Sequence, residues 1–192
     1  MDSLFMLHLG VNAAWPETLK TSSTYFYNSY DIEGQVKQAH AGEYHEGKAG
    51  FVVHLPKFRL VGTTPTGTYP MTIYTICPER LNSGGWQQDK EKYADKLLEY
   101  AEVRLPGLRK HIKTAVVVTP DDFREITYLQ HHAFGGIAPI MDAWRVPHQT
   151  PVKGLWFIGA QSESGGGVNA VIPAAYKTVK KALNLKSSEP VL

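Results

Sequence analysis

The sequence predicts an α+β fold. Three observations predict it: apolar segments of strand length recur along the chain, one long segment has apolar residues at helical spacing, and the C-terminal part runs from an apolar strand through three glycines into a helix. A chain of 192 residues suits one domain or a domain with an appendage. Its composition, 43% apolar and 20% charged, is that of an ordinary globular protein.

Four segments are predicted strands. Residues 68–78, "TYPMTIYTICP", alternate β-branched or aromatic residues and end at Pro78, and residues 114–120, "TAVVVTP", are also stopped by a proline. The other two strands are the apolar runs "LFMLHLGV" and "AGFVVHLP", residues 4–11 and 49–56. The cluster "GTTPTG" predicts a turn at 62–67, and the polar residues 21–50 predict loops with weak helix or strand.

The clearest helix is predicted from about Gln88 to Arg104. Apolar residues recur there at helical spacing, and "LPGL" ends the helix. Asp121 or Asp122 is placed to cap a short helix that follows the fourth strand. Residues 134–148 are irregular, apolar and rich in glycine and proline, which is typical of packed linkers or of ligand walls.

The C-terminal segment "GLWFIGAQSESGGGVNAVIPAAYKTVKKAL", residues 154–183, predicts a buried strand, a glycine turn and a helix. Three consecutive glycines, 165–167, allow positive φ angles or a close approach of the backbone to a ligand. Proline is best tolerated in the first turn of a helix, so Pro173 predicts that the helix begins near residues 169–171. Its first amides then face the glycines and form a site for an anion or a polarised oxygen.

Several interpretations of this turn compete. It can be a tight connection that holds no ligand. A nucleophile elbow requires glycine two residues before the serine, but Ser162 stands there before Ser164. A phosphate-binding P-loop requires Lys and Ser or Thr after its glycines, but Val168 and Asn169 follow them, which excludes it. The remaining interpretation is a cofactor site built from backbone groups.

Charge and cysteine content restrict the compartment in which the protein is expected and the classes of partner that it can bind. The net charge of +2 and the absence of a long basic block argue against nucleic acid. Cys77 is the only cysteine, so an internal disulfide is excluded and a reducing compartment is expected, with Cys77 as a small buried residue. No membrane-spanning run and no signal peptide are found, which predicts a cytoplasmic protein. His131 and His132 have no third ligand at metal spacing, so no metal site is predicted.

Five segments in order resemble one known family. They are "DSLFMLHLGVN", "LLEYAEVRLPGLRKHI", "VVTPDDFRE", "AWRVPH" and "GLWFIGAQSESGGGVNAV", and they span nearly the whole chain. The chain resembles the C-terminal portion of the bacterial-type phytoene desaturase and carotenoid isomerase family, which are FAD-dependent oxidoreductases of carotenoid biosynthesis within the amine oxidase superfamily. The motifs identify the family more sharply than its substrate.

The resemblance implies an architecture and a set of roles. Residues 1–150 form the substrate-domain portion, an antiparallel sheet with helices on one face, and residues 151–192 form the flavin-contacting strand and helix. Gly159 and Ala160 lie near the ribityl and pyrophosphate part of FAD. The pyrimidine edge of the flavin is contacted by backbone amides of the turn, which belong to Gly165, Gly166, Gly167, Val168 and Asn169.

The resemblance also implies a wall for the substrate cavity near the flavin ring. Trp144, Pro147 and His148 belong to this wall. His148 has a second interpretation, as a structural histidine whose hydrogen bonds are satisfied, and we favour the structural interpretation. The family's own N-terminal half is a dinucleotide fold that begins with a strand, G-x-G-x-x-G and a helix. We find no such unit with its acidic partner in this sequence, so the Rossmann-like half is absent from it.

The expected function follows from these points. The chain is the C-terminal part of an FAD-dependent oxidoreductase that acts on an apolar isoprenoid or polyene, such as a carotenoid, by hydride transfer to flavin. It depends on a dinucleotide-binding domain or a partner chain, and alone it is expected to be inactive. Peripheral membrane contact and self-association through an exposed apolar patch are also expected. The alternatives are amine oxidation, or a non-catalytic remnant that binds a lipid or a protein without flavin.

Overall fold

The computed structural model describes residues 2–15, 17–56, 67–128, 145–186 and 188. The chain divides into two compact units, Met1–Ala133 and Phe134–Leu192, which are described separately. The division reflects that each unit makes most of its contacts within itself. The predicted functional division, with flavin contacts beginning at residue 151, stays a prediction.

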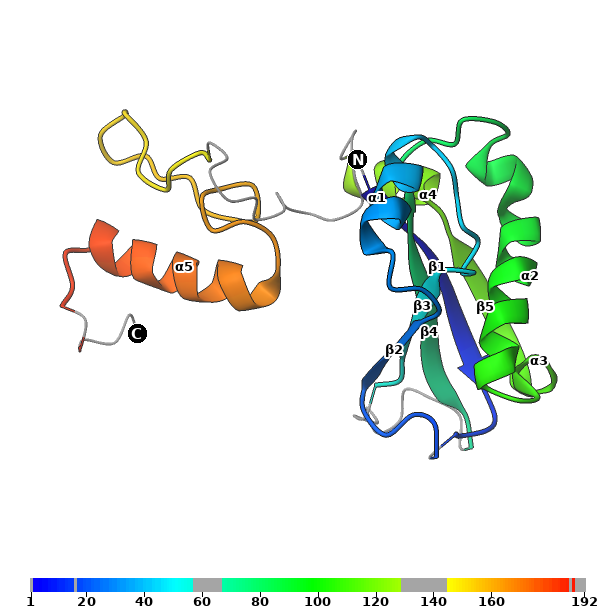
Figure 1. The fold of residues 1–192 in the computed structure, drawn as a ribbon. Coiled ribbons are helices and arrows are strands. Elements are labelled where there is room, and N and C mark those ends of the chain that lie inside the picture. Colours follow the sequence, from blue (N-terminus) through cyan, green and yellow to red (C-terminus); the bar gives the residue numbers. More distant parts are fainter. Residues whose placement is uncertain (1, 16, 57–66, 129–144, 187, 189–192) are drawn as a thin grey trace. The chain divides into compact units, whose positions relative to one another are not determined.

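The first unit is built on a five-stranded antiparallel sheet in the order β2-β3-β4-β1-β5 (Figure 1). This confirms the predicted α+β class and the four predicted strands. The strands are β1 (Asp2–Val11), β2 (Ser23–Tyr27), β3 (Gly50–His54), β4 (Tyr69–Pro78) and β5 (Ile112–Val118). The segment 21–50, predicted as mostly loop, contains β2 and the helix α1 (Ile32–His40).

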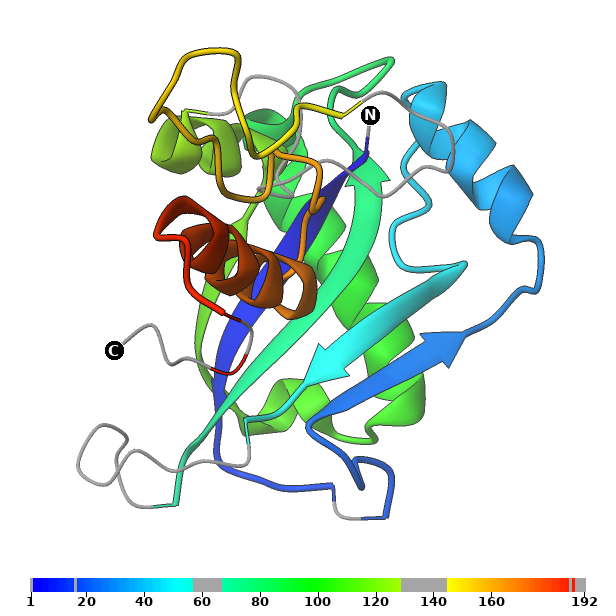
Figure 2. The same cartoon turned by 90° about the vertical axis from the view of Figure 1, so that its left-hand side faces the viewer.

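The long helix α2 (Trp86–Arg104) packs along one face of the sheet and lies behind the strands in Figure 2. It is the helix predicted at 88–104. The short helices α3 (Leu108–His111) and α4 (Pro120–Thr127) flank β5 in the sequence.

The core forms where β1 and β4 pair over their full ten-residue lengths, from Asp2 opposite Pro78 to Val11 opposite Tyr69. Alternate residues of these strands face α2, and each buried apolar side chain contributes about 2 kcal/mol. The core residues include Phe5, Leu7, Leu9, Met71, Ile73, Tyr93, Leu97 and Ala101. Cys77 is fully buried among them, as predicted.

The β1–β5 pairing is irregular at Gly10, and the backbones come close there. A side chain added at Gly10 would lie 2.7 Å from the Thr114 methyl group, so glycine is required for this approach. The predicted turn at 62–67 has only Gly67 among the described residues.

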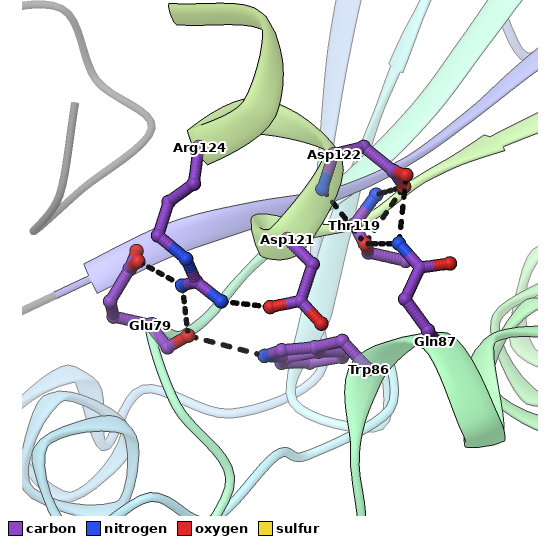
Figure 3. A network of polar contacts seen from close by, with 7 residues as sticks. All are labelled: Glu79, Trp86, Gln87, Thr119, Asp121, Asp122 and Arg124. Carbon is purple, nitrogen blue, oxygen red and sulfur yellow. Dashed lines mark hydrogen bonds and ion pairs between the residues drawn. The ribbon is translucent and has the colours of Figure 1, made fainter. Parts of the chain in front are cut away.

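A polar network joins the end of β4, the start of α2 and the start of α4 (Figure 3). Thr119 caps α4: its hydroxyl accepts from the Asp122 amide at 3.3 Å, and the Asp122 carboxylate accepts from the Thr119 amide at 2.8 Å. Gln87 of α2 donates to the same carboxylate at 2.8 Å. The predicted cap at Asp121 or Asp122 is therefore wrong by a few positions, because the reciprocal pair places Asp122 in the first turn.

The neighbouring residues of the network hold α4 to the end of β4. Arg124 forms ion pairs with Glu79 and Asp121, and the Trp86 indole donates to the Glu79 carbonyl at 3.3 Å. Glu79 itself is buried, with 8% of its surface exposed. A buried carboxylate is tolerated only when it is paired, so the Arg124 contact fixes how α4 approaches the sheet.

His45 is a polar residue against the core, held in one neutral form. Its Nδ1 accepts from the Gly47 amide at 3.1 Å, and its Nε2 lies 3.2 Å from the hydroxyl of the buried Thr75. Burial lowers the pKa of His45 below its usual value of 6.5. Protonation at Nδ1 would also break the Gly47 hydrogen bond.

We expect Thr119→Val to lower the free energy of unfolding by about 1 kcal/mol, because it removes the N-cap hydroxyl at nearly constant volume. Urea denaturation followed by circular dichroism measures this. Thr114→Val, the same change on the exposed edge strand, is the control and should have little effect. Equal effects of the two substitutions would show that the cap does not stabilise α4.

We expect the chain to lose stability as the pH falls from 7 to about 5, in part through His45. The pKa of His45 is lower in the folded state, so below about 6.5 the unfolded state binds a proton that the folded state does not. His45→Gln should therefore flatten this part of the stability profile, measured by urea denaturation at each pH. The exposed His40→Gln is the control, and an unchanged slope in His45→Gln would contradict the account.

Candidate functional site

The predicted flavin-contacting turn lies in the second unit, directly before helix α5 (Val168–Ala182). Three glycines adopt positive φ: Gly159 at 134°, Gly165 at 71° and Gly167 at 104°. A side chain at Gly159 or Gly167 would meet no atom within 4 Å. Glycine is therefore required at these two positions for backbone conformation, and the space beside them is open.

Helix α5 begins at Val168, one residue before the predicted range, and no side chain caps it. The Ala170 and Val171 amides bond to the Gly167 carbonyl, at 3.0 and 2.9 Å. The amides of Val168 and Asn169 have no hydrogen-bond partner among the described residues, and Val168 is 71% exposed. These amides and the helix dipole present partial positive charge to any acceptor that reaches the turn.

Pro173 lies inside α5 and not in its first turn, contrary to the prediction from which the helix start was derived. It leaves the Asn169 carbonyl without the amide that a regular helix would supply from position 173. The helix nevertheless continues beyond the proline to Ala182.

His148 connects three segments of the second unit. Its Nε2 lies 2.9 Å from the Ser162 hydroxyl, and its Nδ1 lies 2.9 Å from the Thr178 hydroxyl of α5. Its amide donates to the Glu163 carboxylate at 2.9 Å, and the same carboxylate oxygen lies 3.2 Å from Nδ1. Both ring nitrogens are thus hydrogen-bonded, as the structural interpretation of His148 requires.

Ser162 fixes the conformation of the turn on the other side of His148. Its hydroxyl donates to the Gly159 carbonyl at 2.6 Å and lies 3.0 Å from the Ser164 hydroxyl. Together with His148 and Glu163 this resembles a hydrolase triad in composition. Ser162 is fully buried and its hydroxyl is bonded to the backbone, so it is not placed to attack a substrate.

A cavity of about 590 Å³ lies beside His148 within the second unit. Of the predicted cavity residues, Pro147 and His148 line it, and Trp144 lies outside the described residues. None of the three consecutive glycines lines it. The lining comes from α5, including Ala170 in its first turn, and from the segment before the helix: Pro147, His148, Gln149, Trp156, Glu163, Ala170, Pro173, Ala174, Lys177, Thr178 and Lys181.

The predicted strand "LWFIGA", residues 155–160, is not formed. Only an isolated bridge between Gln149 and Trp156 occurs there, and the apolar side chains of Leu155, Phe157 and Ile158 are 56%, 38% and 38% exposed. An apolar strand of buried type requires neighbouring strands on a sheet, and the described residues of this unit supply none. Gly159 and Ala160 follow this segment and are only partly buried.

The described part of the chain lacks two kinds of feature, a metal-ligand cluster and a membrane-spanning helix. Its His, Cys, Asp and Glu residues form no group of three that could hold a metal ion. Within the same ranges, none of the helices combines the length and the apolar character that crossing a membrane requires. The predicted pair His131 and His132 lies outside the described residues.

Comparison with known proteins identifies the relatives of the chain. No protein-family model matches it. It is 31% identical over 186 residues to the lycopene-forming phytoene desaturase of Pantoea ananas, covering 92% of this chain and 37% of that protein. It is 27% identical over 190 residues to the corresponding desaturase of Paracoccus sp. strain N81106, covering 95% and 37%.

A weaker match is to the pyridine nucleotide-disulfide oxidoreductase domain-containing protein 2 of Rattus norvegicus, 30% identical over 115 residues, or 54% of this chain. The chain thus spans little more than a third of the length of the desaturases it matches, 37% in each of the two above. The two desaturase matches cover nearly all of this chain and agree with the resemblance carried by its motifs. The chain belongs to the phytoene desaturase family and corresponds to its C-terminal portion.

Proposed function

We propose that this chain forms the substrate-domain portion and the terminal flavin contact of an FAD-dependent oxidoreductase that acts on a carotenoid or another isoprenoid or polyene. The single observation that carries the proposal is the uncapped start of α5. The amides of Val168 and Asn169 point out of a glycine turn with open space beside it. A flavin carries carbonyl oxygens on its pyrimidine edge, and these are the acceptors that such amides fit.

The residues of the chain have distinct tasks in this proposal. Bound FAD would supply the oxidising power for removal of two hydrogens from the substrate, formally one hydride and one proton. Gly165 to Asn169 bind the pyrimidine edge, and the positive end of α5 favours negative charge on that edge. Ser162 and His148 hold the turn in the conformation that presents these amides.

The other half of the flavin site has to come from a dinucleotide-binding domain, either in the same protein or in a partner chain. The exposed apolar residues Leu155, Phe157 and Ile158 support this proposal. They have the composition of a buried strand, and such a strand becomes regular when it joins a sheet that the other half provides. A cytoplasmic location and contact with a membrane surface that holds the apolar substrate belong to the same proposal.

The proposal can be tested by titrating the ¹⁵N-labelled chain with FAD and following its amide resonances. We expect weak binding that shifts the amides of Gly165 to Asn169, because the free amides of the turn are the groups that contact the flavin. No shifts up to millimolar FAD, or shifts confined to the first unit, would contradict the proposal and favour a module that binds no flavin.

A matched pair of variants makes the titration specific. Gly167→Ala introduces a side chain where φ is 104° and should abolish the shifts, because the turn can no longer hold its conformation. Gly154→Ala introduces the same side chain where φ is 81°, also in open space but away from the start of α5, and should leave them unchanged. Equal behaviour of the two variants would show that the turn is not the binding site.

We expect His148→Leu to destabilise the second unit by about 2 kcal/mol, because it leaves the Ser162 and Thr178 hydroxyls without their shared partner. Amide hydrogen exchange should become faster throughout α5 and in residues 159–164. His40→Leu, a change of the same kind in the first unit, should leave these amides unaffected. Unaltered exchange in His148→Leu would show that the histidine does not hold the turn.

A further inference from the structure

The face of the sheet opposite α2 carries two rows of side chains that differ in character. Strand alternation places Phe5, Leu7 and Leu9 against the core, so Met6 and His8 point to the other face. We call this second face the open face. Several of its side chains are well exposed, among them Tyr25 and Val116 at 57% each.

The first row crosses all five strands and is polar on four of them. Pairing places Ser23 opposite His54, His54 opposite Thr72, Thr72 opposite His8, and His8 opposite Val116. The Nδ1 atom of His54 lies 2.8 Å from the Ser23 hydroxyl, and the Nδ1 atom of His8 lies 3.0 Å from the Thr72 hydroxyl. Each imidazole is therefore oriented by a hydroxyl group on the neighbouring strand.

The Nε2 atoms of these two histidines make no hydrogen bond with any described residue. The two residues lie two strands apart in the sheet, so their backbones are about 10 Å from each other along the row. Nε2 can donate or accept, depending on the tautomer that the hydroxyl selects. Two oriented hydrogen-bonding groups thus stand on a surface that is otherwise largely apolar.

The neighbouring row is aromatic and apolar. It runs Tyr25, Val52, Tyr74, Met6 and Val118 across the same five strands. The ring of Tyr25 stacks on Tyr27 with centroids 6.4 Å apart. Burial, together with the adjacent Tyr25 hydroxyl, raises the pKa of Tyr74 to about 12, so its hydroxyl stays neutral.

The polar row and the aromatic row together favour one class of ligand. Neither row contains a lysine, arginine, aspartate or glutamate, so the ten residues of the two rows provide no acidic or basic counter-charge of these types for an ionic ligand. The aromatic row suits an extended apolar body, and the histidine row suits a neutral group that can accept or donate a hydrogen bond. A pure hydrocarbon would leave the histidine row desolvated without a partner, which costs free energy.

We propose that the open face binds an extended isoprenoid or polyene that carries a hydroxyl or carbonyl oxygen, and that the row of His8 and His54 recognises this oxygen. The inference rests on the proposed function for the apolar body of the ligand and adds the oxygen function to it. His8 and His54 determine specificity by hydrogen bonding and take no part in the redox step.

The test uses two carotenoids that share one skeleton and differ in oxygen. Zeaxanthin has a hydroxyl group on each ring and β-carotene has none, and both can be delivered to the full 192-residue chain in detergent micelles. Binding is followed by the visible absorbance shift and induced circular dichroism. We expect the chain to bind zeaxanthin about tenfold more tightly than β-carotene, the ratio that one net hydrogen bond supplies.

The double variant His8→Val, His54→Val should bring the ratio close to one by weakening zeaxanthin binding alone. Ser23→Ala with Thr72→Val, which keeps both imidazoles but removes the hydroxyls that orient them, should lower the ratio partly. The exposed His40→Val is the control and should leave it unchanged. Equal binding of both carotenoids by the parent chain, binding of neither, or an undiminished preference in the double histidine variant would overturn the inference.

The outcome is separable from that of the flavin titration. Carotenoid preference is measured without FAD and depends on the first unit, while the flavin titration follows amides of the second unit. Loss of the preference with intact flavin shifts would reject the oxygen recognition alone. A preference that persists without flavin shifts would reject the flavin contact alone.

Discussion

The pairing of β1 with β4 is the interaction on which the first unit depends. Ten residues of each strand lie opposite one another at the centre of the sheet, and all other strands attach to this pair or to its neighbour. The pairing aligns Phe5, Leu7 and Leu9 with Met71 and Ile73 in one apolar surface that α2 covers. Strand alternation then leaves the other face uncovered by α2, so the same register that builds the core also builds the open face.

The second unit is organised differently, because no sheet supports it within the described residues. Its shape depends on hydrogen bonds that converge on His148 and on the backbone around Gly159. Such polar contacts position a turn accurately but bury little apolar surface. This explains how the segment 155–158 can be apolar in sequence and still be exposed. In our account the missing cover is the dinucleotide-binding half of a flavin site.

The sequence predicted what depends on local patterns. Apolar runs and alternation located β1, β3, β4 and β5, and helical spacing located α2 to within two residues at its start. The start of α5 was predicted from Pro173 at 169–171, and the helix begins at Val168. Helix α1 escaped prediction because Ala39 is its only buried residue, so it has almost no apolar pattern. Its start depends on Asp31, whose carboxylate accepts from the Gly34 amide, and a single cap is a weak signal within a polar segment.

The features that were missed depend on contacts between distant residues. Nothing local to Ser162 or Thr178 indicates that both meet His148, which lies 14 and 30 positions away. The rows on the open face also require the register of five strands, which no single segment contains. The strand at 155–160 was predicted from its apolar composition, but a strand forms only where a neighbour can pair with it.

Hydrogen–deuterium exchange of the whole chain tests most directly the claim that it joins a complete sheet unit to a terminal segment that lacks its sheet. The amides of β1 and β4 should exchange most slowly, since they are paired and buried. The amides of Ile158 and Ala160, which bond to no described residue, should exchange within the shortest labelling times. If residues 155–160 are instead as strongly protected as β1 in the isolated chain, the segment already has its partner and the account of a half-built flavin site is wrong.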